Sequence, residues 1–387
     1  MSSGRIAYRG VAIFDGAVRY EGHALVIEDD TITAIIPEEK LDLAIKAKYL
    51  SGGMIVPGFV DLQVNGGGGV MFNDCPSVDT LQRMAQAHAR LGATSILPTL
   101  ITDMPEKTLS AIDAAVAAVL HGVPGILGLH LEGPHLAGDK CGAHNPDLIR
   151  SMTDKDIHIL CNAAQRLPVV MITLAPENVR SEQIIQLVSA GIIVSIGHSN
   201  ATYEQVAQAV AAGATCTTHL FNAMRPLGSR EPGVVGATLV LGELSAGLIA
   251  DGVHVHPSSI RAALRGKCGP GQIFLVSDAM AVAGTSKDHF ELGGRLVTRS
   301  DGRLVLQDGT LAGADLDLLT AVRNLSRWGI LDVDTAIAMA TAIPADVIGC
   351  SSRVGTLKSG GRADFQLVSI YGSDDSEVWQ SGYRVPA

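Results

Sequence analysis

The sequence predicts an α/β protein: a parallel (β/α)8 TIM-like barrel joined to a small β-sandwich domain that the N- and C-terminal segments form together. Three observations support this prediction. After residue 55, eight short apolar runs alternate with stretches of helical spacing. Seven of these eight runs end in an ionisable or amide side chain. The length of 387 residues fits one barrel with a small additional domain.

The composition agrees with a large aliphatic core. Hydrophobic residues make up 47% of the chain and aromatic residues only 4%, with 43 glycines, as expected where strands and helices alternate through many tight turns. The formal net charge of −10 argues against nucleic acid or an anionic membrane as the main partner. An anionic substrate would therefore need a locally positive site. The six cysteines are scattered, as expected of unpaired thiols in a reducing compartment.

Residues 1–55 are expected to begin the small β domain. The stretches "RIAYRGVAIFDG" and "HALVIEDDTITAIIPE" have the pattern of short strands separated by turn signals. Residues 349–387 should complete this domain, because neither segment is long enough to bury a core alone. The start of the chain has no apolar stretch typical of a secretory signal, and we expect a cytoplasmic protein.

Residues 56–348 are expected to form the barrel. The predicted strands are the apolar runs at 55–64, 94–100, 125–131, 169–174, 192–196, 215–218, 247–250 and 273–276. Stretches such as "VDTLQRMAQAHARLG" between them have helical spacing. The insert "HFELGGRLVTRSDGRLVLQDG" predicts β-hairpins on the barrel rim, without a chemical role. Asp315 is expected to cap the helix that follows it.

The carboxyl ends of barrel strands meet at one rim, where active sites of this fold lie. The predicted strands end at Gln63 and Asn65, Thr99, Glu132, Glu177, His198, His219, Asp251 and His254, and Asp278. Each of these residues alone could be structural, but the joint pattern predicts a catalytic rim. Glu177 remains open between a structural and an active-site role. His130, two residues before Glu132, either supports the site or fills the barrel.

Glu132, His198 and His219 provide one carboxylate and two imidazoles, a set that suits one divalent ion with open positions for water. Zn²⁺ is the favoured ion, and Fe²⁺ accepts the same ligands. Such an ion lowers the pKa of bound water towards ~7. Asp278, in "FLVSDAM", is placed to take up the proton of that water and return it to a leaving amine. The residues therefore predict metal-assisted hydrolysis of an amide.

Eight motifs carry a family resemblance that covers nearly the whole chain. They are "PGFVDLQVNG", "HLEGPHL", "GAHNP", "SIGHSNATYEQ", "THLFNAM", "ADGVHVHP", "LVSDAM" and "TLAG". In this order they resemble the N-acetylglucosamine-6-phosphate deacetylases, a family of the amidohydrolase superfamily. The resemblance implies hydrolysis of the acetamide of N-acetyl-D-glucosamine 6-phosphate, with Glu132, His198 and His219 as metal ligands and Asp278 as general base and acid. It also implies a homodimer.

The resemblance further implies a set of substrate contacts. His144 would support the acetyl carbonyl, backbone amides would meet the sugar phosphate, and basic groups would meet its charge. The implied contacts are Ala143, His144, Asn222, Ala223, Arg230, Asp251, His254, Leu311, Ala312 and Gly313. In this set, Arg230 and His254 would bind the phosphate, and Leu311 to Gly313 would close over the sugar.

Gln63 and Asn65 stand where two-metal members of the superfamily carry a His-x-His pair. A neutral amide oxygen is a weak ligand for a transition metal, whereas imidazole is a strong one. We therefore expect one tightly held metal per chain, with Gln63 and Asn65 as non-ligands. Two other interpretations remain open at this point. The substrate could be a different amide, such as N-acetylgalactosamine 6-phosphate or an N-acyl amino acid, or the chain could be a metal-free scaffold.

Overall fold

The computed structural model describes residues 4–369 and 376–386. Its centre is an eight-stranded parallel sheet in which each strand pairs with the next along the chain. The strands are β8 (Phe59–Val64), β11 (Ala93–Ile101), β12 (Leu129–Glu132), β13 (Val170–Leu174), β14 (Ile193–Ile196), β15 (Cys216–Thr217), β16 (Ser245–Leu248) and β17 (Ile273–Leu275). A parallel bridge between Val64 and Ala279 brings the last strand back to the first. The predicted (β/α)8 barrel is thus confirmed.

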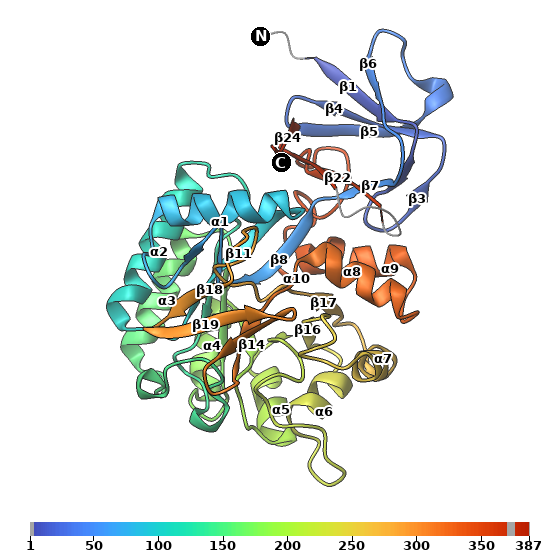
Figure 1. Ribbon diagram of the computed structural model, residues 1–387. Coiled ribbons are helices and arrows are strands. Elements are labelled where there is room, and N and C mark those ends of the chain that lie inside the picture. The colour runs from blue at the N-terminus through green and yellow to red at the C-terminus, as the bar shows by residue number, and fades with distance from the viewer. Residues whose placement is uncertain (1–3, 370–375, 387) are drawn as a thin grey trace.

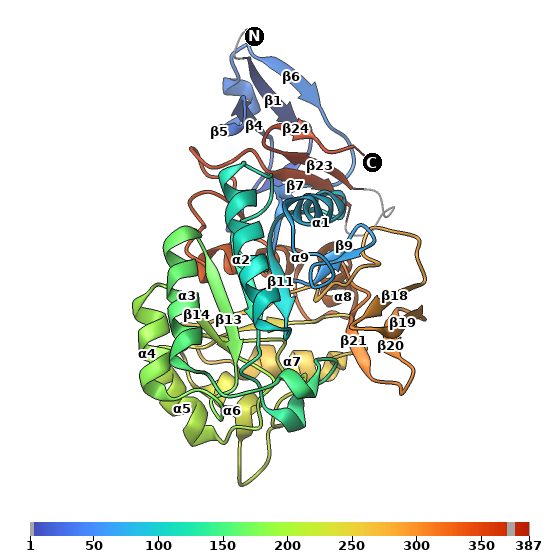
Figure 2. The ribbon, with the colours of Figure 1, turned by 90° about the vertical axis from the view of Figure 1, so that its left-hand side faces the viewer.

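Helices surround this sheet, as Figures 1 and 2 show. They are α1 (Val78–Arg90), α2 (Pro105–Leu120), α3 (Asp154–Arg166), α4 (Ser181–Ser189), α5 (Tyr203–Ala211), α6 (Gly233–Val240), α7 (Pro257–Gly266), α8 (Leu318–Arg327), α9 (Val333–Ala338) and α10 (Ala342–Val347). The barrel strands are buried along nearly their whole length, because helices cover their outer face. This explains why the sequence shows continuous apolar runs in place of alternation.

The first predicted strand is in fact two strands. β7 (Met54–Pro57) pairs with the small β domain, and β8 starts the barrel after Gly58. A side chain at residue 58 would not fit, since its Cβ would lie 2.1 Å from Thr94 Oγ1. The run of apolar residues gave no sign of this division, because both halves are fully buried.

The small β domain contains two sheets, one built from N-terminal strands and one that combines strands from both ends of the chain (Figure 1). One sheet has the strand order β5-β4-β1-β6 and the other β24-β23-β22-β7-β2-β3. Their bounds are β1 (Arg5–Arg9), β2 (Ala12–Phe14), β3 (Arg19–Tyr20), β4 (His23–Glu28), β5 (Thr31–Pro37), β6 (Lys46–Tyr49), β22 (Phe365–Val368), β23 (Glu377–Gln380) and β24 (Tyr383–Arg384). Phe365 stacks on Trp379 at 4.8 Å between ring centroids, and Tyr8 packs edge-on against both rings.

An antiparallel sheet lies between β17 and α8, as the hairpin pattern predicted. It consists of β18 (His289–Leu292), β19 (Arg295–Ser300), β20 (Arg303–Leu306) and β21 (Leu311–Ala314). The expected cap at Asp315 is wrong. Asp317 is the N-cap of α8, since its carboxylate accepts from the Thr320 N–H at 2.8 Å. Asp315 instead pairs with Arg299 of the inserted sheet at 2.7 Å.

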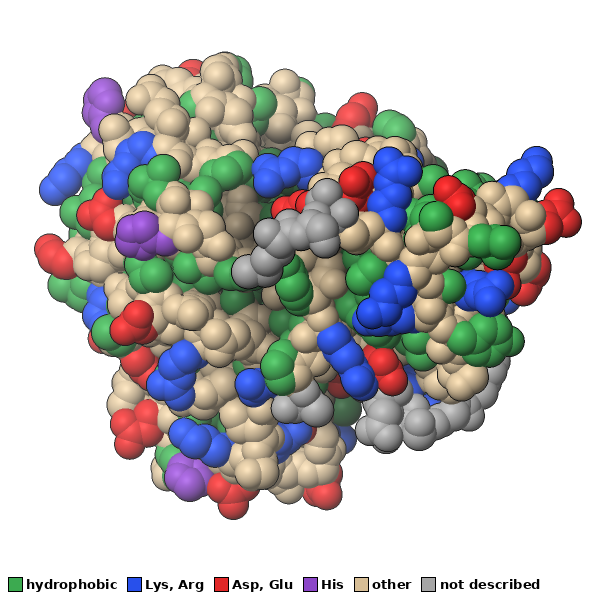
Figure 3. Space-filling view, turned by 90° about the horizontal axis from the view of Figure 1, so that it is seen from above, with side chains coloured by type: hydrophobic (Ala, Val, Ile, Leu, Met, Phe, Trp, Pro, Cys, Tyr) green, Lys and Arg blue, Asp and Glu red, His purple; other side chains and the backbone are tan. Residues whose placement is uncertain are grey.

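Within residues 4–369 and 376–386, we find no helix with the length and apolarity needed to cross a bilayer. On the face of the molecule seen in Figure 3, basic and acidic side chains are interspersed without a large area of one sign.

The aromatic contacts of the small β domain give a stability prediction. Phe365→Ala should lower the free energy of unfolding by about 3–5 kcal/mol, because it leaves a cavity beside Tyr8 and Trp379. Urea unfolding followed by tryptophan fluorescence measures this, since Trp379 stacks on the deleted ring. Leu43→Ala is the matched control, because Leu43 is fully exposed. Equal unfolding midpoints for both variants would contradict the packing described here.

Candidate functional site

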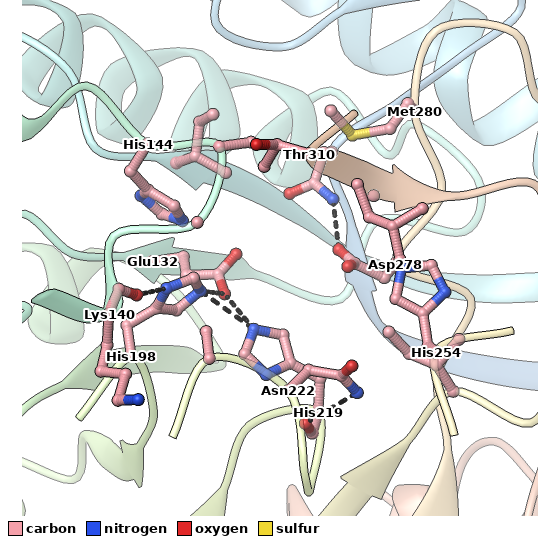
Figure 4. Close-up of a pocket in the computed structure, with 18 of the residues that line it drawn as sticks. Glu132, Lys140, His144, His198, His219, Asn222, His254, Asp278, Met280 and Thr310 are labelled. Carbon is pink, nitrogen blue, oxygen red and sulfur yellow. Dashed lines mark hydrogen bonds and ion pairs between the residues drawn. The ribbon is translucent and has the colours of Figure 1, made fainter. Parts of the chain in front are cut away.

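A cavity of about 360 Å³ opens at the carboxyl ends of the barrel strands. Many residues that the sequence singled out line it, and Figure 4 shows several of them facing one another across it. These are Asn65, Glu132, Ala143, His144, His198, His219, Asn222, Ala223, His254, Asp278, Leu311 and Gly313. The structure thus brings the predicted metal ligands, the predicted proton acceptor and most predicted substrate contacts together at one rim.

Glu132, His198 and His219 form a compact buried cluster. Glu132 Oε1 lies 3.1 Å from Nε2 of each histidine, and the two Nε2 atoms lie 3.0 Å apart. Ligands placed 2.1 Å from one tetrahedral ion would be about 3.4 Å apart, so the triangle has close to the size that a single ion requires. The donor set of one carboxylate and two imidazoles also fits Zn²⁺ or Fe²⁺.

The main chain is held in unfavourable conformations around this cluster. Of the eight non-glycine residues with positive φ in the described part of the chain, five lie in the loops that follow β14, β15 and β17. They are His198, His219, Phe221, Ala223 and Asp278. Such backbone costs of order 1–3 kcal/mol per residue and persists only where surrounding contacts enforce it. The fold therefore loses some stability at these residues, and in return the side chains of the cluster are held in a fixed orientation.

Neighbouring groups define the state of the cluster. The Nδ1–H of His198 donates to the Lys140 carbonyl at 2.7 Å, so Nε2, which faces Glu132 at 3.1 Å, is the atom that would bind an ion in place of its proton. Burial opposes ionisation of Glu132, but hydrogen bonds from His198 and His219 outweigh it and hold the pKa of Glu132 well below its usual value. Burial likewise lowers the pKa of His219, yet the bond to Glu132 raises it overall.

Asp278 lies across the cavity and is held by two amides. Asn65 Nδ2 donates to Asp278 Oδ1 at 2.7 Å, and Gln63 Nε2 donates to the same oxygen at 3.1 Å and to Glu132 at 3.2 and 3.3 Å. Burial, followed by the charge of Glu132, raises the pKa of Asp278 to about 6. Oδ1 of Asn65 is buried and has no partner among the described residues.

The remaining predicted contacts fall into two groups. Asp251 supports the cavity from behind, because its carboxylate accepts from Nδ1 of His254 at 2.6 Å. Burial would raise the pKa of Asp251, but the hydrogen bond from His254 outweighs it and lowers the pKa. Ala312 is fully buried in the inserted sheet, and Gln63 is buried and does not itself line the cavity. Arg230 is not at the cavity: it is exposed in the long loop between β15 and α6.

Arg230 was placed at the phosphate through the family resemblance alone. Within this chain, its side chain is exposed and does not line the cavity, and its contact with the phosphate stays a prediction. Glu177 and His130, for which the sequence left two roles open, can be placed by their contacts. Glu177 is structural, since its carboxylate accepts from Ser199 Oγ at 2.8 Å and from the Asn200 N–H. His130 fills the barrel: its Nδ1–H donates to the Leu62 carbonyl at 3.0 Å, and its Nε2 lies 2.7 Å from Thr173 Oγ1.

Sequence reasoning missed several residues that line the cavity. They are Ile101, Asp139, Lys140, Gly142, Ile249, Met280, Leu292 and Thr310. Most lie outside the ends of the predicted strands. Leu292 ends β18 and Thr310 directly precedes β21, so the inserted sheet and its turns form one wall. Gly142 is the first residue of the "GAHNP" stretch and Lys140 lies two residues before it, and this adjacency was the available signal.

A buried carboxylate below the site was also missed. Asp61 accepts from the N–H groups of Gln63 and Ser277, at 3.2 Å each, and so joins β8 to the segment that carries Asp278. Its side chain is fully buried, and burial raises the pKa of Asp61 to about 7. Its position two residues before Gln63 places it on the same face of β8, a relation that the strand period could have given.

Asp61 predicts how stability depends on pH. Its folded-state pKa exceeds its unfolded value of 3.8, so the folded state binds more protons and stability falls as the pH rises from about 4 to about 7. Between pH 5 and pH 7 this amounts to about 2–3 kcal/mol, at 1.36 kcal/mol per pKa unit. Urea unfolding in EDTA should show this loss for the wild type and a smaller loss for Asp61→Asn. Identical pH dependence in both proteins would contradict the assignment.

Comparisons with known proteins agree with this site. Residues 54–382 match the Amidohydrolase family, and residues 9–55 match the NagA composite domain. The chain is 44% identical to an N-acetylgalactosamine-6-phosphate deacetylase of Shewanella sp. (strain ANA-3), over 86% of this chain and 83% of that protein. It is 38% identical to an N-acetylglucosamine-6-phosphate deacetylase of Haemophilus influenzae, over 87% of this chain and 88% of that protein.

The crystal structure of N-acetylglucosamine-6-phosphate deacetylase from Pasteurella multocida superimposes with a TM-score of 0.93 at 35% identity, and 98% of each chain is covered. Fold, cavity and sequence thus agree. The chain belongs to the amidohydrolase family and, within it, to the N-acetylglucosamine-6-phosphate deacetylases and their galactosamine counterparts.

Proposed function

We propose that the protein hydrolyses the acetamide of N-acetyl-D-glucosamine 6-phosphate and releases D-glucosamine 6-phosphate and acetate. The observation that carries this proposal is the meeting of a metal-binding cluster and a separate carboxylate, Asp278, in one cavity at the barrel rim. Relatives named as deacetylases of this substrate, at 38% identity in Haemophilus influenzae, support the choice of amide.

Glu132, His198 and His219 would hold one divalent ion, with Zn²⁺ preferred over Fe²⁺. When bound there, such an ion supplies an acidic water and polarises the acetyl carbonyl. The amides of Gln63 and Asn65 support a single ion, because their NH₂ groups point at Glu132 and Asp278. Donors in those positions occupy the carboxylate oxygens that a second ion would need.

Asp278 would receive a proton from the attacking water and pass it to the amine nitrogen. A pKa of about 6 keeps it ionised near neutral pH and still lets it donate a proton readily. Asn65 and Gln63 hold the carboxylate in place by donating to Oδ1. Oδ1 of Asn65, which no described residue contacts by a hydrogen bond, offers an acceptor to an N–H or O–H group of the sugar.

The walls of the cavity suit the rest of the substrate. We propose that His144 contacts the acetyl carbonyl, that Asn222, Ala223 and His254 meet the phosphate, and that the inserted sheet covers the sugar at Leu311 and Gly313. Asp251 would hold the ring of His254 in place. The homodimeric state, the cytoplasmic location and the absence of nucleic-acid and membrane partners stay predictions.

N-acetylgalactosamine 6-phosphate is a second candidate substrate. The Shewanella relative at 44% identity bears the name of that activity, and the two sugars differ only in the configuration of one hydroxyl group. The metal-binding cluster and Asp278 would act on the acetamide of both sugars in the same way. The choice therefore depends on contacts with the sugar ring and not on the chemistry of the amide.

Acetate release from the two sugar phosphates tests the function. We expect release from N-acetyl-D-glucosamine 6-phosphate with the higher kcat/KM, and a drop of at least about 10³-fold in kcat for Asp278→Asn, which keeps the shape and removes the proton acceptor. A higher kcat/KM for the galactose epimer would transfer the assignment to the second candidate. Absence of acetate from both would refute the proposed function.

Metal titration tests the single ion. Protein stripped of metal should regain full activity at one equivalent of Zn²⁺ per chain, with metal content measured by mass spectrometry. Glu132→Ala and His219→Ala should bind less than about a tenth of the metal, because each removes a ligand from a buried cluster. Asn65→Ala is the control that keeps metal binding. Saturation only at two equivalents would refute the one-metal site.

A further inference from the structure

His144 lines the cavity, but only one of its ring nitrogens can face a substrate. Figure 4 shows the ring above Glu132 and His198, and its centroid lies 4.4 Å from that of His198. The other nitrogen, Nδ1, is turned towards Thr102, the first residue after β11. Both side chains are buried, His144 with 4% exposure and Thr102 with 6%. Which nitrogen carries the proton decides whether His144 donates or accepts in the cavity.

The backbone of Thr102 fixes the answer. Its N–H lies 3.3 Å from Nδ1 of His144, and an N–H group can only donate. Nδ1 must therefore carry a lone pair. The hydroxyl Oγ1 of Thr102 lies 2.8 Å from the same Nδ1 and must then donate as well, since two facing lone pairs would repel. Its alternative acceptor, the carbonyl of Glu132, is farther away at 3.3 Å.

The surroundings hold both donors in place. Asn73 Nδ2 donates to the Ile101 carbonyl at 3.1 Å, and this carbonyl belongs to the peptide unit whose N–H points at His144. Because a peptide unit is planar, fixing one end fixes the other. The hydroxyl is confined by Gly133, where a Cβ atom would lie 2.2 Å from Thr102 Oγ1. Only glycine at residue 133 leaves room for this threonine.

We propose that Thr102 is a positioning residue for His144: its N–H and O–H both donate to Nδ1 and thereby fix the tautomer that carries the proton on Nε2. The Nε2–H is then a permanent donor into the cavity, aimed where the acetyl carbonyl oxygen of the substrate gains negative charge. A fixed donor of this kind stabilises the transition state more than the ground state. The inference rests on the proposed amide hydrolysis for its catalytic consequence, but the tautomer itself does not.

Three variants separate this role from a merely structural one. Thr102→Val keeps the shape and removes the hydroxyl, and we expect kcat to fall about 10- to 100-fold, as for other groups that orient a functional histidine, with KM changing by less than about threefold. Thr102→Ser keeps the hydroxyl and should restore most of kcat. Thr94→Val is the matched control on the same strand, because the Thr94 hydroxyl is buried and has no hydrogen-bond partner within residues 4–369 and 376–386. It should leave kcat unchanged.

Equal kcat for Thr102→Val and the wild type, or equal loss in Thr102→Val and Thr102→Ser, would overturn the proposal. The tautomer is read without any turnover from long-range ¹H–¹⁵N spectra of Zn²⁺-loaded protein labelled with ¹⁵N-histidine. The signals of His144 are those lost in His144→Gln. We expect an unprotonated Nδ1 and a protonated Nε2, and the reverse pattern would also overturn the proposal. If neither sugar phosphate releases acetate, the proposed function fails while the spectra still decide the tautomer.

Discussion

The site depends on how the barrel closes between its first and last strands. Backbone hydrogen bonds join β8 to the segment after β17: the Asp278 N–H donates to the Gln63 carbonyl at 3.1 Å, and the Asn65 N–H donates to the Ala279 carbonyl at 2.9 Å. Asp61 adds a carboxylate to the same junction. Because of this closure, a side chain at residue 278 faces side chains at residues 63 and 65, more than 200 positions earlier. Without this closure, the Asp278 carboxylate would not face the amides of Gln63 and Asn65.

Two buried carboxylates in one cavity would repel each other strongly if nothing lay between them. Here Gln63 Nε2 lies between Glu132 and Asp278 and donates to both. The amide thus provides two partial positive charges in the place where a full positive charge would otherwise be needed. This explains why residues that are poor metal ligands are still buried at 2% exposure or less in the centre of the site. Their contribution is electrostatic support of the acids.

Much of this arrangement could be predicted from the sequence alone, because the carboxyl ends of all strands of a parallel barrel meet at one rim. That rule correctly placed Glu132, His198, His219 and Asp278 together. The rule gives no position for side chains that lie outside the strand ends. Arg230 lies in a long loop whose path no periodicity encodes, and the pairing of Asp315 with Arg299 depends on how the inserted sheet folds back. Lys140 enters the cavity from an irregular loop for the same reason.

The inserted sheet β18–β21 has its own small core, in which Phe290, Val297 and Leu304 pack apart from the main core of the barrel. It supplies Leu292, Thr310, Leu311 and Gly313 to the cavity but none of the predicted metal ligands. One wall of the cavity is therefore encoded in a segment that supplies no predicted metal ligand. Changes in the insert can reshape this wall while the metal cluster and Asp278 stay untouched. A family built in this way can acquire a new epimer preference without having to rebuild its catalyst.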